Sequence, residues 1–488
     1  MSATATDLYE TTIGLEIHVE LSTVSKMFCG CAVTFGGQPN SRTCPVCLGM
    51  PGSLPVVNEK AIDYTMRIAR ALNCNIATYS LFHRKNYFYP DMPKNYQISQ
   101  YDLPLGSQGF VQITGDFGST RVGINRVHLE EDTGKSIHVG GSGRIADSDY
   151  SLEDFNRAGT PLVEIVSEPD IHSAEEARVF VTELRAVLDA LEVSDVRMEE
   201  GSLRVDANIS VRRQGESEHG AKVEVKNMNS IRSVVRALEH EEGRQRAALD
   251  KGETLVQETR HFDEKTATTS SMRTKEYAFD YRYFPEPDLV PFEPSEAWVH
   301  SIEESLPELP AERRERFAKD YGLNEADIGI LTATRAMSAW FEAAARAYSG
   351  DAKKIVNWII ADLFGLVNEA GIELSESKLA PEQLGGLVKL IDEGAISGKQ
   401  AKVVLQEMFA TGKDAATVAQ EKGLQQVSDE GAIEAAVDEM IAENAEAADK
   451  VRAGNLGTIG FLVGRVMQKT KGQANPQMVN EVLRRKLT

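Results

Sequence analysis

Acidic side chains recur in several short segments that are rich in Val, Ile and Leu. In the segment 13–21 the odd-numbered residues are apolar, and Glu16, His18 and Glu20 stand between them. This period of two residues is typical of a β-strand with one buried and one polar face. Further segments with an acidic residue in a similar apolar setting lie at 127–131, 162–166, 204–211 and 222–226.

If these strands share one sheet, a single face of that sheet gathers the polar groups. The residues on that face would be Glu16, His18, Glu130, Glu164, Asp206 and Glu224. Like charges in close proximity raise one another's pKa, and a hard divalent cation with oxygen ligands relieves the repulsion. The pattern therefore predicts a divalent cation site. For any single strand the alternative is a solvated sheet face.

Four of the five cysteines form two close pairs, Cys29 with Cys31 and Cys44 with Cys47. Two such pairs on two turns can surround a tetrahedral Zn²⁺ with four thiolates. The spacing predicts a structural zinc site, because a closed set of four protein ligands leaves no position for a substrate. The alternatives are a redox pair and a knuckle that holds its loop without metal. Cys74 is expected to be a single core thiol.

Composition indicates a soluble globular chain of 488 residues with a net charge of −21. No apolar run approaches the roughly 20 residues of a membrane span, and the acidic start lacks the features of a secretory signal. We therefore expect a cytoplasmic protein without a membrane partner. The segment 451–488 differs, since it has seven basic residues and one acidic residue. Such a patch can bind phosphates, although a solvated helix face has the same charge pattern.

The distribution of elements predicts strands and helices up to about residue 290, followed by helices alone. The aromatic segment 84–101 is expected to form the wall of a pocket, and 111–131 to form a hairpin that turns near 115–119. The predicted domains are 1–292, 293–394 and 395–488. The predicted helices are 58–72, 173–191, 231–246, 310–321, 336–349, 353–369, 381–392, 398–411, 431–444, 457–469 and 476–486.

Residues 151–170 read SLEDFNRAGTPLVEIVSEPD, and this run resembles the signature of the B subunit of the bacterial Asp/Glu-tRNA amidotransferases. Further stretches with the same resemblance lie at 14–20, 85–101, 222–229, 257–260, 271–288 and 460–476. The resemblance implies an α+β fold: a cradle domain like glutamine synthetase on a mostly antiparallel sheet, then an all-α domain and an all-α tail domain.

The resemblance also implies an enzyme of three subunits. The A subunit, an amidase, releases ammonia from glutamine, and the small C subunit joins the other two. The B subunit uses ATP and Mg²⁺ to phosphorylate the side chain of Glu mischarged on tRNA(Gln), or of Asp on tRNA(Asn), and ammonia displaces the phosphate. The large inserted domain of the related archaeal protein is not visible in this sequence, so the bacterial type is favoured.

Site residues follow from the same resemblance. It places Glu16, His18, Glu130, Glu131, Glu164, Asp206 and Glu224 in the metal and phosphate pocket, with Glu16, His18 and Glu131 as magnesium ligands. Arg273 and Lys275 are expected to bind the triphosphate, although a surface ion pair is the alternative. Lys85 is expected on the ammonia path, and Arg465, Lys469 and Lys471 on the tRNA-binding surface.

Two other functions fit parts of the sequence. A non-enzymatic tRNA-binding scaffold would explain the zinc site and the basic tail. A free-standing ligase for small molecules, of the glutamine synthetase type, would explain the acidic face but not the tail.

Overall fold

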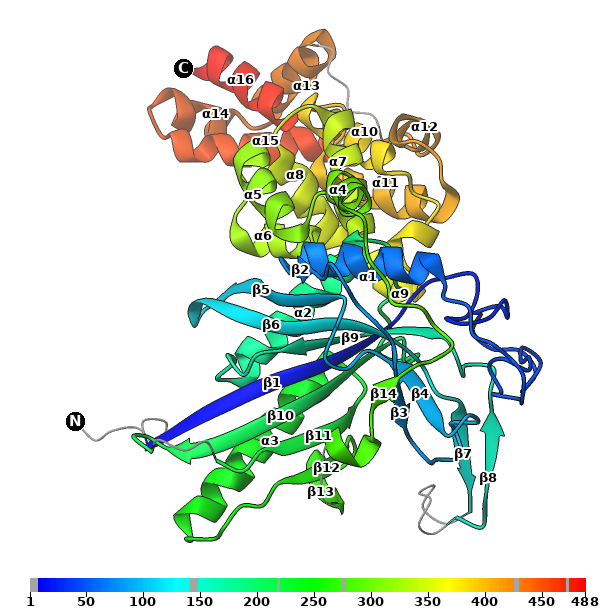
Figure 1. Cartoon of the computed structure of the whole chain (residues 1–488). Coiled ribbons are helices and arrows are strands. Elements are labelled where there is room, and N and C mark those ends of the chain that lie inside the picture. The colour runs from blue at the N-terminus through cyan, green and yellow to red at the C-terminus, as the bar shows by residue number, and fades with distance from the viewer. Residues whose placement is uncertain (1–7, 141–147, 217–219, 274–277, 425–429, 471–473) are drawn as a thin grey trace. The chain divides into compact units, whose positions relative to one another are not determined.

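The structure, a computed structural model, describes residues 8–140, 148–216, 220–273, 278–424, 430–470 and 474–488. The chain divides into two compact units, residues 1–310 and 311–488 (Figure 1). All strands of the described residues belong to the first unit, and the second unit contains helices. This order of an α+β unit followed by helical parts confirms the predicted fold class.

A nine-stranded sheet forms the centre of the first unit, in the order β13-β12-β11-β10-β1-β9-β6-β5-β2. Only β11 and β12 run parallel among the paired neighbours of this sheet, so it is mostly antiparallel as predicted. The first strand of the chain, β1, therefore lies in the middle. The bounds are β1 (Tyr9–Glu20), β2 (Asn75–Ile76), β5 (Gly106–Gly115), β6 (Gly118–Glu131), β9 (Pro161–Ser167), β10 (Leu203–Arg213), β11 (Val223–Met228), β12 (Glu258–Asp263) and β13 (Thr268–Arg273).

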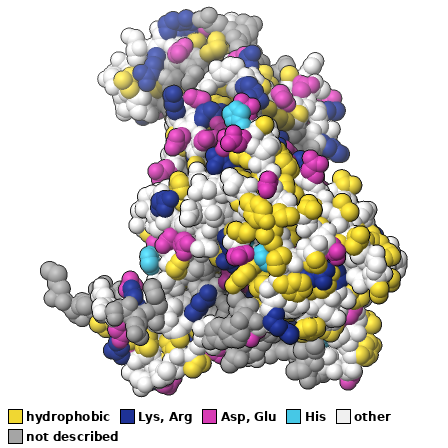
Figure 2. All heavy atoms as spheres, in the orientation of Figure 1, with side chains coloured by type: hydrophobic (Ala, Val, Ile, Leu, Met, Phe, Trp, Pro, Cys, Tyr) yellow, Lys and Arg dark blue, Asp and Glu magenta, His cyan; other side chains and the backbone are white. Residues whose placement is uncertain are grey.

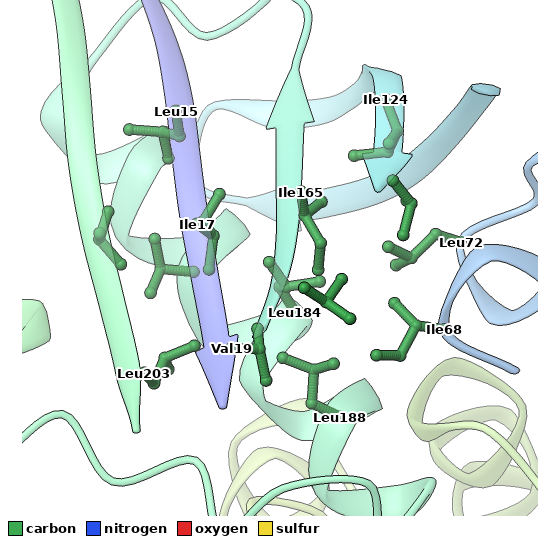
Figure 3. Close-up of a cluster of buried hydrophobic side chains, with 14 of the residues drawn as sticks. Leu15, Ile17, Val19, Ile68, Leu72, Ile124, Ile165, Leu184, Leu188 and Leu203 are labelled. Atoms are coloured by element: carbon green, nitrogen blue, oxygen red, sulfur yellow. The ribbon is translucent and has the colours of Figure 1, made fainter. Parts of the chain in front are cut away.

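The apolar side chains of β1 belong to the hydrophobic core of this unit. Leu15, Ile17 and Val19 are fully buried, and Figure 3 shows them beside Leu184 and Leu188 of a neighbouring helix. Burial of such side chains stabilises the fold by about 1.5–3 kcal/mol each. The helices that contribute to this core are α1 (Glu59–Ala71), α2 (Ala174–Ala190), α3 (Ile231–Asp250) and α4 (Glu296–Glu304).

Two smaller sheets complete the first unit. The aromatic segment that we expected to form a pocket wall forms β3 (His83–Asn86) and β4 (Tyr96–Ser99), which pair with β14 (Phe284–Pro285). A 3₁₀ turn, η3 (Ala278–Tyr281), precedes β14. The ribbon of β7 (Lys135–Val139) and β8 (Tyr150–Asp154) is two-stranded.

The second unit has two separate hydrophobic clusters, one within 317–419 and one within 433–487. Helix α4, by contrast, belongs to the first unit, because its Ile302 packs in the hydrophobic core of that unit. The domain bounds 1–292, 293–394 and 395–488 stay a prediction. The elements are α5 (Pro310–Tyr321), α6 (Glu325–Leu331), α7 (Arg335–Tyr348), α8 (Ala352–Trp358), η4 (Ile359–Leu363), α9 (Phe364–Ala370), η5 (Leu374–Glu376), α10 (Pro381–Asp392), α11 (Gly398–Thr411), α12 (Ala415–Glu421), α13 (Glu430–Glu443), α14 (Ala445–Arg452), η6 (Leu456–Thr458), α15 (Ile459–Lys469) and α16 (Pro476–Leu487).

In the described part of the chain, no helix has both the length and the apolar character needed to cross a membrane. Hydrophobic side chains do reach the surface of the first unit (Figure 2). A group of them lies in the loops between β1 and α1: Val24, Phe35, Met50, Leu54 and Val56.

Candidate active site

The polar side chains of β1 point away from the hydrophobic core. Glu16 lies opposite Asp206 of β10, and His18 lies between Arg204 of β10 and Glu164 of β9. Directly opposed residues of antiparallel strands share a face. The register therefore places these five groups on one surface.

The same surface continues over the next strands on both sides. Glu164 pairs with His128 of β6, and Glu130 lies two residues beyond His128. On the other side, Asn208 of β10 pairs with Glu224 of β11. All six residues that the sequence placed on one sheet face therefore do share a face, which we call the charged face.

Two buried carboxylates and two histidines meet at the centre of the charged face. Glu164 Oε2 lies 3.2 Å from His128 Nε2 and 3.7 Å from His18 Nε2. Glu130 Oε2 lies 3.5 Å from His128 Nε2 and accepts a 3.0 Å hydrogen bond from Ser99 Oγ. One ligand atom each from His18, Glu130 and Glu164 lies within 4.8 Å of the others. This spacing can accommodate a small cation.

Mutual attraction outweighs burial in fixing the charges of this cluster. Burial opposes the protonation of His128, but the carboxylates of Glu164 and Glu130 raise its pKa to about 9. Burial would raise the pKa of Glu130, yet His128 and Lys85 lower it. For Glu164, burial likewise opposes the charge, and His128 and His18 lower its pKa well below the usual value.

The raised pKa of His128 predicts a loss of stability at alkaline pH. Because the folded-state pKa lies above the unfolded value near 6.5, the stabilisation is complete below that pH and is lost as pH rises through about 9. The shift corresponds to about 3 kcal/mol. Urea denaturation from about pH 6 to about pH 10 measures it. The wild type should lose about 3 kcal/mol more over this range than His128→Asn, in which the other titrating groups still act; parallel curves would contradict the assignment.

Lys226 neutralises the second group of acids on the charged face. Its Nζ lies 2.6 Å from Asp206 and 3.4 Å from Glu224, and Thr259 donates a 2.8 Å hydrogen bond to Glu224. Glu16 accepts a 2.8 Å hydrogen bond from Asn208. The acids that the sequence suggested would repel one another are therefore interspersed with cations.

A third group lies where β1 and β10 meet the end of β6. Arg204 lies 2.6 Å from buried Asp132, and Arg157 lies 3.7 Å from it. Burial opposes the charge on Asp132, but Arg204 and Arg157 lower its pKa to about 2. Burial, and then the neighbouring charge of Asp132, raise the pKa of Glu20 to about 8. Glu20 therefore holds its proton to a higher pH than an ordinary glutamate does, whereas Asp132 stays ionised.

The β3–β4 hairpin brings Lys85 to the central cluster. Burial opposes the charge on Lys85, but Glu130, together with Glu164, outweighs burial and raises its pKa. Its Nζ lies 5.0 Å from the ring centre of Tyr281. The half-buried Tyr283 stacks on Tyr101 at a ring-centre distance of 4.3 Å. The charges of both carboxylates of the central cluster thus act on Lys85.

Glu131 does not join Glu16 and His18. Alternation along β6 turns Glu131 to the opposite face from Glu130, where it pairs with Lys94 and accepts a 2.9 Å hydrogen bond from the Ile98 amide. The three magnesium ligands predicted from the resemblance are therefore divided between two faces. The geometric cluster is instead His18, Glu130 and Glu164.

The four cysteines converge, as their spacing predicted. One sulfur from each of Cys29, Cys31, Cys44 and Cys47 lies within 4.8 Å of the others, and none forms a disulfide. The hydrogen bond with Cys29 lowers the pKa of Cys47 to about 4, against the effect of burial, and the Cys44 amide and Lys26 act in the same direction. A cluster of four cysteines in which one thiol ionises easily is suited to bind a tetrahedral Zn²⁺.

The predicted triphosphate and tRNA contacts are only partly within the described residues. Arg273 ends β13, where its backbone lies opposite Thr259, and its side chain lies outside the described part. Lys275 and Lys471 also lie outside it. On α15, Arg465 is exposed, whereas Lys469 is paired with Glu439 at 2.7 Å and Glu443 at 3.2 Å.

Sequence reasoning missed the cations of the charged face. His128, Arg204 and Lys226 stand two residues from Glu130, Asp206 and Glu224 on the same strands. The alternation that identified the acids would have identified these bases too, had both signs of charge been considered. Asp132 and Lys94 gave no such signal, since both lie just outside regular strands.

Comparison with known proteins agrees with this architecture. A family model described as the GatB/GatE catalytic domain matches residues 11–300, and one described as the GatB domain matches 339–487. The B subunit of the Aspartyl/glutamyl-tRNA(Asn/Gln) amidotransferase of Carboxydothermus hydrogenoformans is 51% identical over 98% of this chain and 99% of its own length. That of Persephonella marina is 51% identical over 97% of this chain and 98% of its own length.

Matches of this extent place the chain in the class of ligase-type amidotransferase subunits. The chain belongs to the GatB family.

Proposed function

We propose that this chain uses ATP to phosphorylate the side-chain carboxylate of Glu on tRNA(Gln), of Asp on tRNA(Asn), or of both. Ammonia then displaces the phosphate, which yields Gln-tRNA or Asn-tRNA for translation. A carboxylate is a poor electrophile at neutral pH, and phosphorylation supplies a leaving group. Phosphoryl transfer depends mainly on positioning and charge neutralisation, and the charged face offers both.

The observation that carries the proposal is the convergence of Glu130, Glu164 and His18 beside Lys85. The carboxylates of Glu130 and Glu164, whose oxygens lie within 4.8 Å of one another, supply the oxygen ligands that a hard divalent cation such as Mg²⁺ prefers, with His18 beside them. When bound, Mg²⁺ would neutralise phosphate charge. The protonated His128 then keeps the remaining carboxylate charge in balance.

Cations around this cluster suit the anionic substrates. The side chains of Arg126, Arg204 and Lys226 are each about one-third exposed, at 36%, 36% and 37%. The buried Nε of Arg204 has no hydrogen-bond partner within the described chain, so this donor is available to a carboxylate or phosphate oxygen. We place Arg273 and Lys275 at the triphosphate, because β13 belongs to the same sheet.

Partners complete the reaction in this proposal. The amidase, or A subunit, supplies ammonia, which reaches the activated carboxylate past Lys85, and the small C subunit joins the complex. Exposed apolar side chains in the loops at 24–56 suit a protein partner. We place the complex in the bacterial cytoplasm, where thiols stay reduced.

The test is reconstitution of the chain with candidate amidase and small-subunit partners. Amide formation on Glu-tRNA(Gln) and Asp-tRNA(Asn) is measured with glutamine and with or without ATP. We expect ATP hydrolysis that depends on the mischarged tRNA. Amide formation without ATP, or on free glutamate without tRNA, would refute the proposal, and tRNA binding without ATP use would favour a scaffold.

The cysteine set is proposed to hold one structural Zn²⁺, because four sulfurs within 4.8 Å match a tetrahedral site. We expect about one zinc per chain in the wild type and its loss in Cys44→Ser, measured by elemental analysis. Cys74→Ala is the matched control, since Cys74 is a buried thiol outside the set, and it should retain zinc. A wild type without zinc would refute this part.

We further propose that the tail binds tRNA phosphates through Arg465, Lys469 and Lys471. Arg465→Glu should weaken tRNA binding and reduce the slope of log affinity against log salt by about 1. Lys469→Glu should have a smaller effect, because Glu439 and Glu443 already neutralise Lys469. Filter binding at several salt concentrations measures both. Lys413→Glu, at an exposed ion pair with Glu421, is the control, and equal effects of all three would contradict a tail site.

A further inference from the structure

Lys26 is a buried cation without an acidic partner. It is only 1% exposed and belongs to the largest fully buried side chains of the chain. Its Nζ donates a 3.1 Å hydrogen bond to the Phe155 carbonyl and lies 3.6 Å from Cys47 Sγ. Among the described residues, no carboxylate oxygen lies within 4.0 Å of Nζ.

The environment contrasts with that of a second buried lysine nearby. Both lysines line a cavity of about 140 Å³, which Cys47 and Glu131 also line. Lys94 forms an ion pair with Glu131. Glu131 is thus already engaged, and the sulfur of Cys47 is the anionic group that Lys26 contacts.

The charge of the cysteine set explains this arrangement. A buried ammonium is strongly disfavoured unless an opposite charge is close. Four thiolates around Zn²⁺ carry a net charge of −2. The ammonium group of Lys26, which contacts Cys47, therefore stabilises the zinc site and is stabilised by its negative charge. The buried lysine and the metal-loaded cysteines are therefore complementary.

The same side chain contacts the loop that leads into β9. Besides the bond from Lys26 to Phe155, the Met27 amide donates a 2.7 Å hydrogen bond to the Gly159 carbonyl. Gly159 has a φ of +85°, and a Cβ built there would lie 3.5 Å from Lys26 Cδ and 3.6 Å from Cys47 Cβ. The backbone of this loop thus packs directly on Lys26 and Cys47. Its continuation is β9, which presents Glu164 to the charged face.

We propose that Lys26 is the buried counter-ion of the metal-loaded cysteine set and that it couples metal binding to the order of loop 155–160, and through this loop to β9. Lys26 is therefore a positioning residue, and the zinc centre supports the charged face from a distance. The inference rests on the proposed zinc site.

Zinc dissociation tests the first half. The full-length zinc-loaded chain is mixed with a chromogenic chelator, and the release rate is compared for wild type, Lys26→Met, Lys26→Gln and Lys94→Met. We expect both Lys26 variants to release zinc at least tenfold faster. Lys94→Met removes a buried lysine from the same cavity and should change the rate less than twofold. Unchanged release in a folded Lys26 variant, or equally fast release in Lys94→Met, would overturn the proposal.

Amide hydrogen exchange tests the second half without any substitution. Zinc is removed from the wild type with a chelator, and exchange at 155–160 is compared before and after. We expect exchange there to rise at least tenfold, and to fall back when zinc alone is restored. Unchanged exchange at 155–160 in stripped wild type would overturn the link, even if the Lys26 variants fail to fold. A wild type that never contains zinc would instead refute the proposed zinc site.

Discussion

Glu164→Gln lowers ATP-dependent amide formation by at least about 10³-fold, on the scale of losses from removing one electrostatic group of an active site. The substitution keeps the size of the side chain and removes its charge. Glu164 contacts both His128 and His18, so its neutralisation makes the protonated forms of these histidines less favourable. It also removes one of the three carboxylate or imidazole groups that converge at the centre of the charged face. The reconstituted complex is assayed for Gln-tRNA formation, and the glutaminase activity of the amidase partner should survive.

The control for this prediction is Glu175→Gln. Glu175 is an exposed residue of α2 that pairs with Arg178, and the variant should retain the wild-type rate. Glu131→Gln gives a second comparison, because Glu131 lies on the other face of β6. A larger loss in Glu131→Gln than in Glu164→Gln would place the reacting groups on the side of Lys94. Full activity of Glu164→Gln would remove the charged face from the mechanism.

Glu241→Ala destabilises the first unit by about 3–5 kcal/mol, the usual cost of removing one partner of a buried ion pair. Glu241 of α3 is 0% exposed. Its carboxylate accepts a 2.5 Å bond from Arg244 and a 2.9 Å bond from Thr269, and Arg260 lies 3.4 Å away. Without Glu241, the buried Thr269 hydroxyl loses its acceptor and Gln245 loses a 3.0 Å hydrogen bond. Arg260 keeps Glu258 as its remaining charge partner.

Trp298 allows this loss of stability to be measured in the first unit. It is the one tryptophan of that unit, and it packs against the first hydrophobic core. Urea unfolding is followed by fluorescence in a Trp340→Phe, Trp358→Phe background. Glu175→Ala breaks an exposed pair instead and should cost less than about 1 kcal/mol. Equal losses in the two variants would show that Glu241 contributes no more than a surface charge.

Local patterns predicted the elements of this chain well. The helices expected at 381–392 and 398–411 coincide with α10 and α11, because each has a clear apolar period and a distinct start. The helix expected at 173–191 is α2, and Ser173 is its N-cap. Ser173 accepts from the Glu176 amide, but the Glu176 carboxylate accepts from the His172 amide. Short helices such as α6 and α12, with seven residues each, give too few turns for a period to be seen.

The candidate site was predictable only in part. Alternation along β1 correctly separates Glu16 and His18 from the core, and the structure confirms that the charged residues share a face. Strand order could not be read from the sequence, because β1 pairs with strands far along the chain. The division between Glu130 and Glu131 was missed because the resemblance grouped them, although the two-residue period of a strand separates them.

The central place of β1 has a consequence for synthesis of the chain on the ribosome. Both neighbours of this first strand, β9 and β10, are made much later, and β10 ends at Arg213. At a synthesis rate of 5–20 residues per second, β1 remains without both of its partner strands for roughly 10–40 s. An alternating Leu, Ile and Val segment left unpaired for that time can associate with other nascent chains. We therefore expect newly made chains to engage a chaperone near their N-terminus until β10 has emerged.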